Sequence, residues 1–303
     1  MIDFQYLQPE QRQEFERYLQ AQGERGCEYS FVNLYLWGRQ KAALVHDHLV
    51  FFSQFDRRSV YLYPVGFGDK GPVLEAIRQD AQKRGIPCRL VGLTHDDCAQ
   101  LEAMCPGCLQ MHFDRDSFDY IYDIHDLADL PGRKFQRKRN HLNRFRQNHP
   151  EATIEPITEE NLPAVQALVD RWYTLRLETN PHADYRLERA ALTKALQQRE
   201  ILGMEGLLLS TEQGPVAMTL GSRLSPDTFD VHFEKALDIA DGAYAAINNG
   251  FARYLREKYP ELAYLNREDD MGMEGLRKAK LSYNPHHMVE KHWACLTEDD
   301  YAD

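Results

Sequence analysis

Apolar and polar residues follow two different periods along this chain. Short stretches alternate with period two, which is typical of half-buried strands, and longer stretches repeat apolar residues every three to four positions, as amphipathic helices do. In the first half the pattern predicts helices at 10–21, 72–85 and 96–104 and strands at 1–7, 42–45, 49–55, 59–65, 87–91 and 118–123. We therefore expect this half to be mixed α/β.

The second half repeats the rhythm in a more specific order. It predicts, in turn, a strand at 153–157, helices at 162–177 and 187–199, strands at 206–210, 216–224 and 229–236, helix 243–258, strand 262–266, helix 273–283 and strand 288–296. This β-α-α-β-β-β-α-β-α-β order is that of the acyl-CoA N-acyltransferase (GNAT) fold, and the first half is a looser version of it. We expect an α+β (mixed α/β) protein with two tandem GNAT-like domains. Their predicted ranges are 1–130 and 151–303, joined by a basic helix at 131–150, with the candidate site in the second.

A basic segment interrupts an otherwise acidic chain. The chain has 36 Lys and Arg against 47 Asp and Glu, a net charge of −11. The fourteen residues from Arg133 to Arg146 hold seven Lys and Arg and no acid, so the remainder sums to −11 − 7 = −18. Phe135, Leu142 and Phe145 form one apolar stripe of a helix that could dock on the protein while its cations face an anion. The alternative is a solvated helix paired with acidic patches of its own protein.

Composition bounds the class of protein. Hydrophobic residues make up 43% of the chain, enough for real cores, and only the acidic tail 298–303 is expected to be disordered. The N-terminus has no signal-peptide core, and no apolar run approaches the ~20 residues that span a bilayer. Six Cys in this length fit a reducing compartment. We therefore expect a soluble, cytoplasmic protein that does not bind nucleic acid non-specifically over its surface.

Two short motifs have structural explanations. Residues 66–71 match G-x-G-x-x-G, but Pro72 follows the last glycine where a dinucleotide site needs continuing helix, so a glycine-rich turn is favoured. Cys105 and Cys108 form a single C-x-x-C around Pro-Gly, whereas structural zinc sites usually need two such pairs. No metal site is expected.

The strand at 229–236 carries the candidate catalytic groups. By alternation His232 and Glu234 point to the face opposite Phe229, Val231 and Phe233, about 7 Å apart. A buried strand with His and Glu on one face provides groups for proton transfer. The alternative is a polar face covered by solvent or a loop. Tyr244, at the start of the next helix, is the third catalytic candidate.

The start of that helix is the candidate donor site. Asp241 is a suitable N-cap, followed by Gly242 and Ala243. Free backbone N–H groups at a helix N-terminus bind phosphate, and we expect them to act here together with Lys235. The usual Q/R-x-x-G-x-G/A signature is absent, and of its glycines only Gly242 remains.

A second charged stretch, residues 266–283, could extend the anion-binding surface. The alternative is a capped strand–turn–helix with a charged exterior; its acids do not fit a calcium loop. The candidate donor- and anion-binding residues of the two basic stretches are Arg133, Lys134, Arg137, Lys138, Arg139, Asn140, Arg267, Arg277, Lys278 and Lys280.

Five stretches together resemble one family. They are YSFVNLYLW from Tyr29, FDYIY from Phe118, LPGRKFQRKRNHLNRF from Leu130, VHFEKALDIADGAYAAIN from Val231 and NREDDMGMEGLRKAKLSYNP from Asn266. The chain is similar to the soluble bacterial family related to the C-terminal catalytic domain of phosphatidylglycerol lysyltransferases. The resemblance implies a tandem GNAT fold like that of the lysyltransferases and the Fem-type peptidoglycan aminoacyltransferases. Those relatives move an aminoacyl group from a charged tRNA to a lipid hydroxyl or a peptide amine.

Three hypotheses follow from the sequence. The first is an acyl- or aminoacyltransferase in which His232 or Glu234 acts on the acceptor, backbone N–H groups stabilise the oxyanion, and the basic residues hold tRNA. The second is a non-catalytic module that binds a nucleotide or another polyanion, and the missing glycines favour it. The third is an acyl-CoA-dependent N-acetyltransferase with a degenerate loop. Donor and acceptor stay open; aminoacyl-tRNA and acyl-CoA are the candidate donors.

Overall fold

The computed structural model describes residues 1–37, 40–55, 58–107 and 109–296. Within them the chain forms two compact units. The first comprises residues 1–119, Asp269–Met273 and the chain from Met288, and the second comprises Tyr120–Glu268 and Glu274–His287. Cys108 and the acidic tail 298–303 lie outside the described residues, so their predictions are not tested.

The first unit is built on one mixed sheet. Its helices are α1 (Arg12–Leu19), α2 (Phe31–Leu36), α3 (Gly71–Arg84) and α4 (His95–Met104). Its strands are β1 (Gln5–Tyr6), β2 (Gln40–Val45), β3 (His48–Phe55), β4 (Arg58–Gly66), β5 (Arg89–Leu93), β6 (Leu109–Phe113) and β14 (His292–Leu296). The order across the sheet is β1-β2-β3-β4-β5-β14-β6, and β4 and β5 are parallel because α3 connects them.

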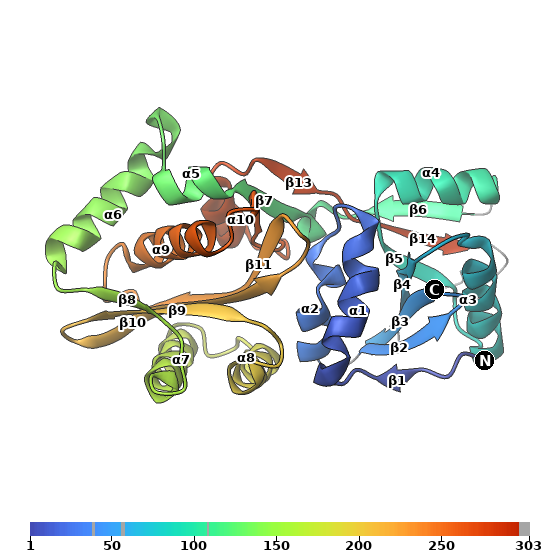
Figure 1. Cartoon of the computed structure of the whole chain (residues 1–303), viewed down its shortest axis with the longest axis horizontal. Coiled ribbons are helices and arrows are strands. Elements are labelled where there is room, and N and C mark those ends of the chain that lie inside the picture. Colours follow the sequence, from blue (N-terminus) through green and yellow to red (C-terminus); the bar gives the residue numbers. More distant parts are fainter. Residues whose placement is uncertain (38–39, 56–57, 108, 297–303) are drawn as a thin grey trace. The chain divides into compact units, whose positions relative to one another are not determined.

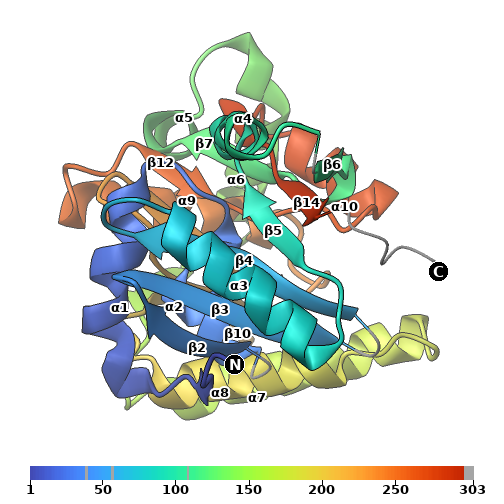
Figure 2. The same cartoon turned by 90° about the vertical axis from the view of Figure 1, so that its right-hand side faces the viewer.

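Helices cover both faces of this sheet. Val73 and Ile77 of α3 are fully buried in a core with Val50 of β3, and Figure 2 shows α3 lying across β3 and β4. The next residue of β3, Phe51, points to the other face and meets Phe15 of α1, with ring centroids 6.1 Å apart. The alternation in β3 thus supplies two apolar layers from one strand.

The second unit has the same layered design around its own sheet. Its helices are α5 (Ile124–Asp129), α6 (Gln136–Asn148), α7 (Leu162–Thr179), α8 (Arg186–Gln198), α9 (Ala243–Lys258) and α10 (Glu274–Leu281). Its strands are β7 (Asp119–Asp123), β8 (Thr153–Pro156), β9 (Glu205–Thr211), β10 (Gly214–Arg223), β11 (Thr228–Ala236), β12 (Tyr264–Asn266) and β13 (His287–Val289). The order is β13-β7-β12-β11-β10-β9-β8, and Figure 1 shows α9 on one face of this sheet and α7 and α8 on the other.

The helix at the basic segment forms as the stripe predicts. Phe135 precedes α6, and it and the α6 residues Leu142 and Phe145 are 0%, 6% and 2% exposed. The helix packs against α9 within the second unit. The apolar stripe is confirmed, and it fixes which side of α6 is left for its cations.

Two predicted strands pair differently from what the predicted domain ranges imply. The stretch predicted as one strand, 288–296, forms two short strands in different sheets: β13 next to β7, and β14 between β5 and β6. Strand β7, predicted within the first domain, pairs with β12 of the second sheet. Both departures come from strand pairs more than a hundred residues apart in sequence, which element order does not reveal.

Candidate functional site

A β-bulge separates two of the predicted catalytic residues. The register between β10 and β11 shifts by one residue next to Leu220. As a result Glu234 lies opposite Thr219, whereas His232 reaches Ser222, with Nε2 2.7 Å from the serine Oγ. Thr219 and Ser222 are three positions apart and face opposite sides of β10. The prediction that His232 and Glu234 share one face is therefore wrong.

Glu234 lies in a buried ion pair on the α9 side of the sheet. Its Oε1 accepts a hydrogen bond from Arg267 Nη2 at 2.8 Å, and its Oε2 accepts one from Asn248 Nδ2 at 3.3 Å. The side chains of Arg267 and Glu234 are only 14% and 9% exposed. Arg267 Nη1 has no hydrogen-bond acceptor among the described residues. The pair therefore keeps one buried donor available for a negatively charged oxygen.

Lys138 of α6 lies beside this ion pair and forms a charged cluster with it. Its ammonium lies 3.6 Å from the centre of the Tyr283 ring, and the Arg267 guanidinium lies 5.0 Å from the same ring. Burial and, second, the nearby Arg267 charge lower the pKa of Lys138 to about 8, although Glu234 partly opposes this shift. Lys138 therefore exists in both protonation states near neutral pH, as general acid–base chemistry requires.

The N-terminus of α9 is capped differently from the prediction. Gly242, not Asp241, is the N-cap, with φ of 89°, and the Asp241 carboxylate accepts a hydrogen bond from Arg144 Nη1 at 2.6 Å. The Ala243 N–H donates to the Ala240 carbonyl at 3.0 Å. The Arg144 contact thus draws the expected capping group toward α6.

Close packing explains the glycine at this position. A Cβ on Gly242 would lie 2.4 Å from the His141 carbonyl oxygen and 3.0 Å from Phe145 Cβ, so α6 fills one side of the turn. Tyr244, two residues on, is 37% exposed and lies near Arg267. One side of the turn is therefore closed by α6, while Tyr244 lies at the edge of the charged cluster.

Lys235 faces away from this cluster. Its ammonium hydrogen-bonds Glu188 Oε1 of α8 at 2.5 Å and lies 4.0 Å from the centre of the Trp172 ring of α7. The side chain is therefore on the α7 and α8 side of the sheet and 8% exposed. The expectation that Lys235 acts with the α9 N-terminus is wrong, because the bulge and the alternation of β11 point it the other way.

His232 belongs to a separate buried network. Its Nδ1 lies 3.2 Å from Glu268 Oε1 and 3.5 Å from Asp230 Oδ2, and its side chain is 1% exposed. Ligand atoms of these three residues lie within 4.8 Å of one another, so they are a group that could hold a cation. A comparable group at Cys27, Glu28 and Asp119 in the first unit already holds a cation, the Lys291 ammonium, 2.6 Å from Asp119 and 2.8 Å from Glu28.

Several cations of the basic segment make contacts within the protein. Lys134 Nζ pairs with Asp126 at 2.7 Å, Arg139 donates to the Leu130 and Gly132 carbonyls, and Asn140 Oδ1 accepts from Gln136 at 2.8 Å. Other cations make no ion pair or hydrogen bond with the described residues; they include the exposed Arg133, Arg137 and Arg146. The interpretation of a helix paired within its own protein therefore holds for the first group of residues, and anion binding by the second group stays a prediction.

The second charged stretch is less available than predicted. Lys280 is 8% exposed, and its ammonium donates to the carbonyls of Arg267 and Glu268. Lys278 pairs with Glu274 at 2.6 Å on the surface, and Arg277 lies on the same helix, α10. Lys280 therefore holds the backbone that presents Arg267, and it is not an anion-facing cation.

Three further residues complete the cluster. Tyr283 lies under both cations, Asn248 holds Glu234, and the Tyr122 ring centre lies 5.6 Å from the Arg267 guanidinium. Asn248 follows Tyr244 by four positions on α9, a spacing that places both on one helix side and could have revealed it. Tyr122 and Tyr283 lie in two of the stretches that resemble the family, but they come from distant segments, and local pattern does not show that they meet.

Comparison with known proteins shows which family this chain matches. The family described as "Phosphatidylglycerol lysyltransferase, C-terminal" matches residues 20–295. A conserved protein of unknown function from Bacteroides thetaiotaomicron VPI-5482 is 39% identical with a TM-score of 0.93, over 98% of this chain and 100% of that one. L-PGS from Bacillus licheniformis is 16% identical with a TM-score of 0.67, over 93% of this chain and 91% of that one.

Another relative is matched over only about half of its own length. An uncharacterised protein of Mycoplasmoides gallisepticum (strain R(low / passage 15 / clone 2)) is 25% identical over 180 residues, which is 58% of this chain and 55% of that protein. In the described residues, no helix is long and apolar enough to cross a membrane.

These findings agree on fold and family. The mixed α/β architecture is a tandem GNAT-like fold, shared with solved structures of low sequence identity. The family match covers most of the chain, including Lys138, Glu234, Arg267 and Tyr283. The chain therefore belongs to the family of the phosphatidylglycerol lysyltransferase C-terminal domain.

Proposed function

We propose that this chain transfers an aminoacyl group from a charged tRNA to an amine or hydroxyl acceptor. Family and fold support an acyl- or aminoacyltransferase. The observation that carries the finer proposal is the buried cluster in which Arg267 Nη1 lacks an acceptor among the described residues and Lys138 lies over the Tyr283 ring. Because the reaction draws on charged tRNA, we place it in the cytoplasm.

Each side chain of the cluster has a role in this reaction. The acceptor nitrogen or oxygen attacks the ester carbonyl of the donor and loses its proton to neutral Lys138. Arg267 Nη1 stabilises the negative oxygen of the tetrahedral intermediate. The bond to the ribose oxygen then breaks, and that oxygen takes the proton back from Lys138. Both Glu234 oxygens already accept hydrogen bonds, so Glu234 is a positioning residue that fixes Arg267.

The surface around the cluster suits a nucleic-acid donor better than coenzyme A. The packing of α6 against Gly242 closes one side of the turn where GNAT proteins hold a pyrophosphate. Arg133 and Arg137, on the same segment as Lys138, are exposed and make no ion pair with described residues. Such cations contribute salt-dependent affinity for a phosphate backbone.

The test is transfer of a labelled amino acid from charged tRNA to a panel of amine and hydroxyl acceptors. We expect Glu234→Gln to lose transfer by about 10²-fold or more, because Arg267 is no longer held in place. Glu188→Gln is the matched control, since that carboxylate pairs with Lys235 on the other face of the sheet. Equal rates for parent and Glu234→Gln would contradict the assigned site.

A non-catalytic binding module is the second candidate, favoured by the Gly242 turn, which α6 closes on one side. It predicts that tRNA binds in a salt-dependent manner and that adding an acceptor does not release the labelled amino acid from the tRNA. The same assay, run beside a binding titration, separates the two functions.

A further inference from the structure

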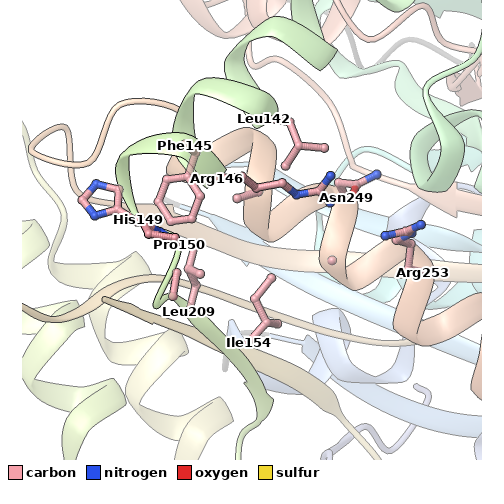
Figure 3. A pocket seen from close by; sticks show the side chains of 12 residues that line it. Leu142, Phe145, Arg146, His149, Pro150, Ile154, Leu209, Asn249 and Arg253 are labelled. Atoms are coloured by element: carbon pink, nitrogen blue, oxygen red, sulfur yellow. The ribbon is translucent and has the colours of Figure 1, made fainter. Parts of the chain in front are cut away.

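A pocket lies between α6, α9 and the edge of the sheet formed by β8 and β9. It has a volume of about 210 Å³ and is lined by α6, β8, β9 and α9 together with the turn after α6. Two consecutive residues of α9 lie at the charged cluster and at the pocket, respectively: Asn248 donates a hydrogen bond to Glu234, and Asn249 lines the pocket. The pocket is therefore separate from the proposed transfer site, and Figure 3 shows its side chains.

The floor of the pocket is apolar. Leu142, Phe145, Leu209 and Ala246 line it and are each at most 6% exposed. Ile154 of β8, which also lines it, is 43% exposed although it is a large aliphatic side chain. Covering a solvent-exposed apolar surface of this kind with a hydrocarbon group lowers the free energy, because apolar surface is removed from water.

The rim of the pocket carries two exposed arginines, although the Asp129 carboxylate is close enough to Arg253 for the two charges to interact. Arg146 and Arg253 line the pocket and are exposed, and neither makes an ion pair or hydrogen bond with any residue that the structure describes. In a chain of net charge −11, many other arginines are paired, for example Arg256 of the same helix with Asp129 at 2.6 Å. Two unpaired guanidinium groups at one opening favour an anionic ligand group.

A buried amide in the wall adds a directional contact. Asn249 is 4% exposed, and its Nδ2 donates to the Leu127 and Ala128 carbonyls at 2.9 and 2.7 Å. These two bonds fix the orientation of the amide, and within the described chain no donor reaches its Oδ1. The pocket thus combines an apolar floor, one fixed acceptor and a cationic rim.

We infer that this pocket binds a small anionic amphiphile: a single hydrocarbon chain that ends in a carboxylate or phosphate. The chain covers Ile154 and the buried floor, and the anionic end pairs with Arg146 and Arg253. A hydroxyl of the head group, such as the P–OH of a monoprotonated phosphate, has Asn249 Oδ1 as its acceptor. This inference uses none of the residues assigned to aminoacyl transfer and stands or falls separately from it.

The experiment is a calorimetric titration of the full chain with octanoate below its micellar concentration. We expect saturable binding that strengthens from butyrate to octanoate, because each added methylene buries further apolar surface. Octanol and octylamine, which share the chain but not the negative charge, should bind about tenfold more weakly or worse. Equal binding of octanol and octanoate, or of inorganic phosphate and octanoate, would overturn the inference.

Two variants locate the ligand. Arg146→Gln/Arg253→Gln should weaken octanoate by about tenfold or more, whereas Arg171→Gln, an exposed arginine of α7, should not. Ile154→Trp should block the pocket, while Leu187→Trp, at a 43% exposed site on α8, should leave binding intact. Unchanged affinity in the arginine double variant or in Ile154→Trp would place the ligand elsewhere and refute the assignment.

Discussion

Each unit contains a buried arginine–carboxylate pair with a lysine and aromatic rings beside it. In the first unit Asp97 binds both terminal nitrogens of Arg25, lies 3.8 Å from Lys70, and also accepts hydrogen bonds from the Thr94 N–H and hydroxyl at 2.9 Å each. In the second unit Glu234 binds one terminal nitrogen of Arg267, and Lys138 lies nearby over Tyr283. The same set of groups is thus arranged in two ways.

The two pairs differ in which guanidinium nitrogen has no hydrogen-bond acceptor among the described residues: Nε in Arg25, whose two terminal nitrogens are both bonded to Asp97, and the terminal Nη1 in Arg267. Thr94 and Asp97 form the capping box of α4, so the first pair joins a helix start to Arg25 and has a structural purpose. In the second unit Arg267 keeps an N–H group without an acceptor in the described chain, next to a lysine whose pKa is lowered to about 8 by burial and by Arg267. A pair with both terminal guanidinium nitrogens bonded stabilises the fold, whereas a pair with one unbonded terminal nitrogen keeps a donor for a ligand at a cost in stability.

The largest expected effect is on stability, at the Arg25–Asp97 pair. Asp97→Ala leaves the Arg25 charge buried and uncompensated and should cost about 3–5 kcal/mol of unfolding free energy. The double variant Arg25→Met/Asp97→Leu removes both charges and should recover most of this loss. Urea unfolding of the three proteins measures it; a double variant as unstable as Asp97→Ala would show that the pair is not the cause.

The next effect is on catalysis, at the Arg267–Glu234 pair. Arg267→Lys keeps the charge but loses the forked donor, and we expect transfer to fall by about 10²–10³-fold. Arg25→Lys, the matched change in the first unit, should leave the rate per folded molecule unchanged. Initial rates, corrected for the folded fraction by circular dichroism, make the comparison, and equal losses in both variants would remove the distinction between the pairs.

A smaller effect is expected in the pH dependence of transfer. If Lys138 accepts the proton, the neutral amine is the active form, and its fraction rises about tenfold between pH 7 and pH 9 for a pKa of about 8. The rate should follow that rise and level off above it. Lys138→Arg stays protonated and should show a low rate without the rise; a parent rate that falls through pH 8 would mean that the charged ammonium is the active form.

The smallest effect concerns the outer surface of the basic segment. Arg133→Gln and Arg137→Gln should each lower the slope of log affinity for tRNA against log salt by about one. Lys134→Gln is the control, since its ammonium is already paired with Asp126. Salt slopes that are the same for all three variants would argue against a polyanion surface here.

Local pattern determined much of this protein. The order of helices and strands in the second half follows the sequence closely, and the stripe of Phe135, Leu142 and Phe145 is buried as the spacing predicts. The sequence also marked Lys138, Glu234 and Arg267 as members of charged stretches. These features depend on neighbours a few residues away, so periodicity and composition are enough to find them.

Only the tertiary structure decided how those residues meet. One bulged residue in β11 reverses the alternation and sends His232 and Glu234 to opposite faces, which no period-two pattern contains. The Arg267–Glu234 contact joins residues 33 positions apart, and β14 pairs with β5 across most of the chain. Such contacts depend on packing between distant segments, and it is this packing that decides which of the basic residues support the fold and which are free to bind a ligand.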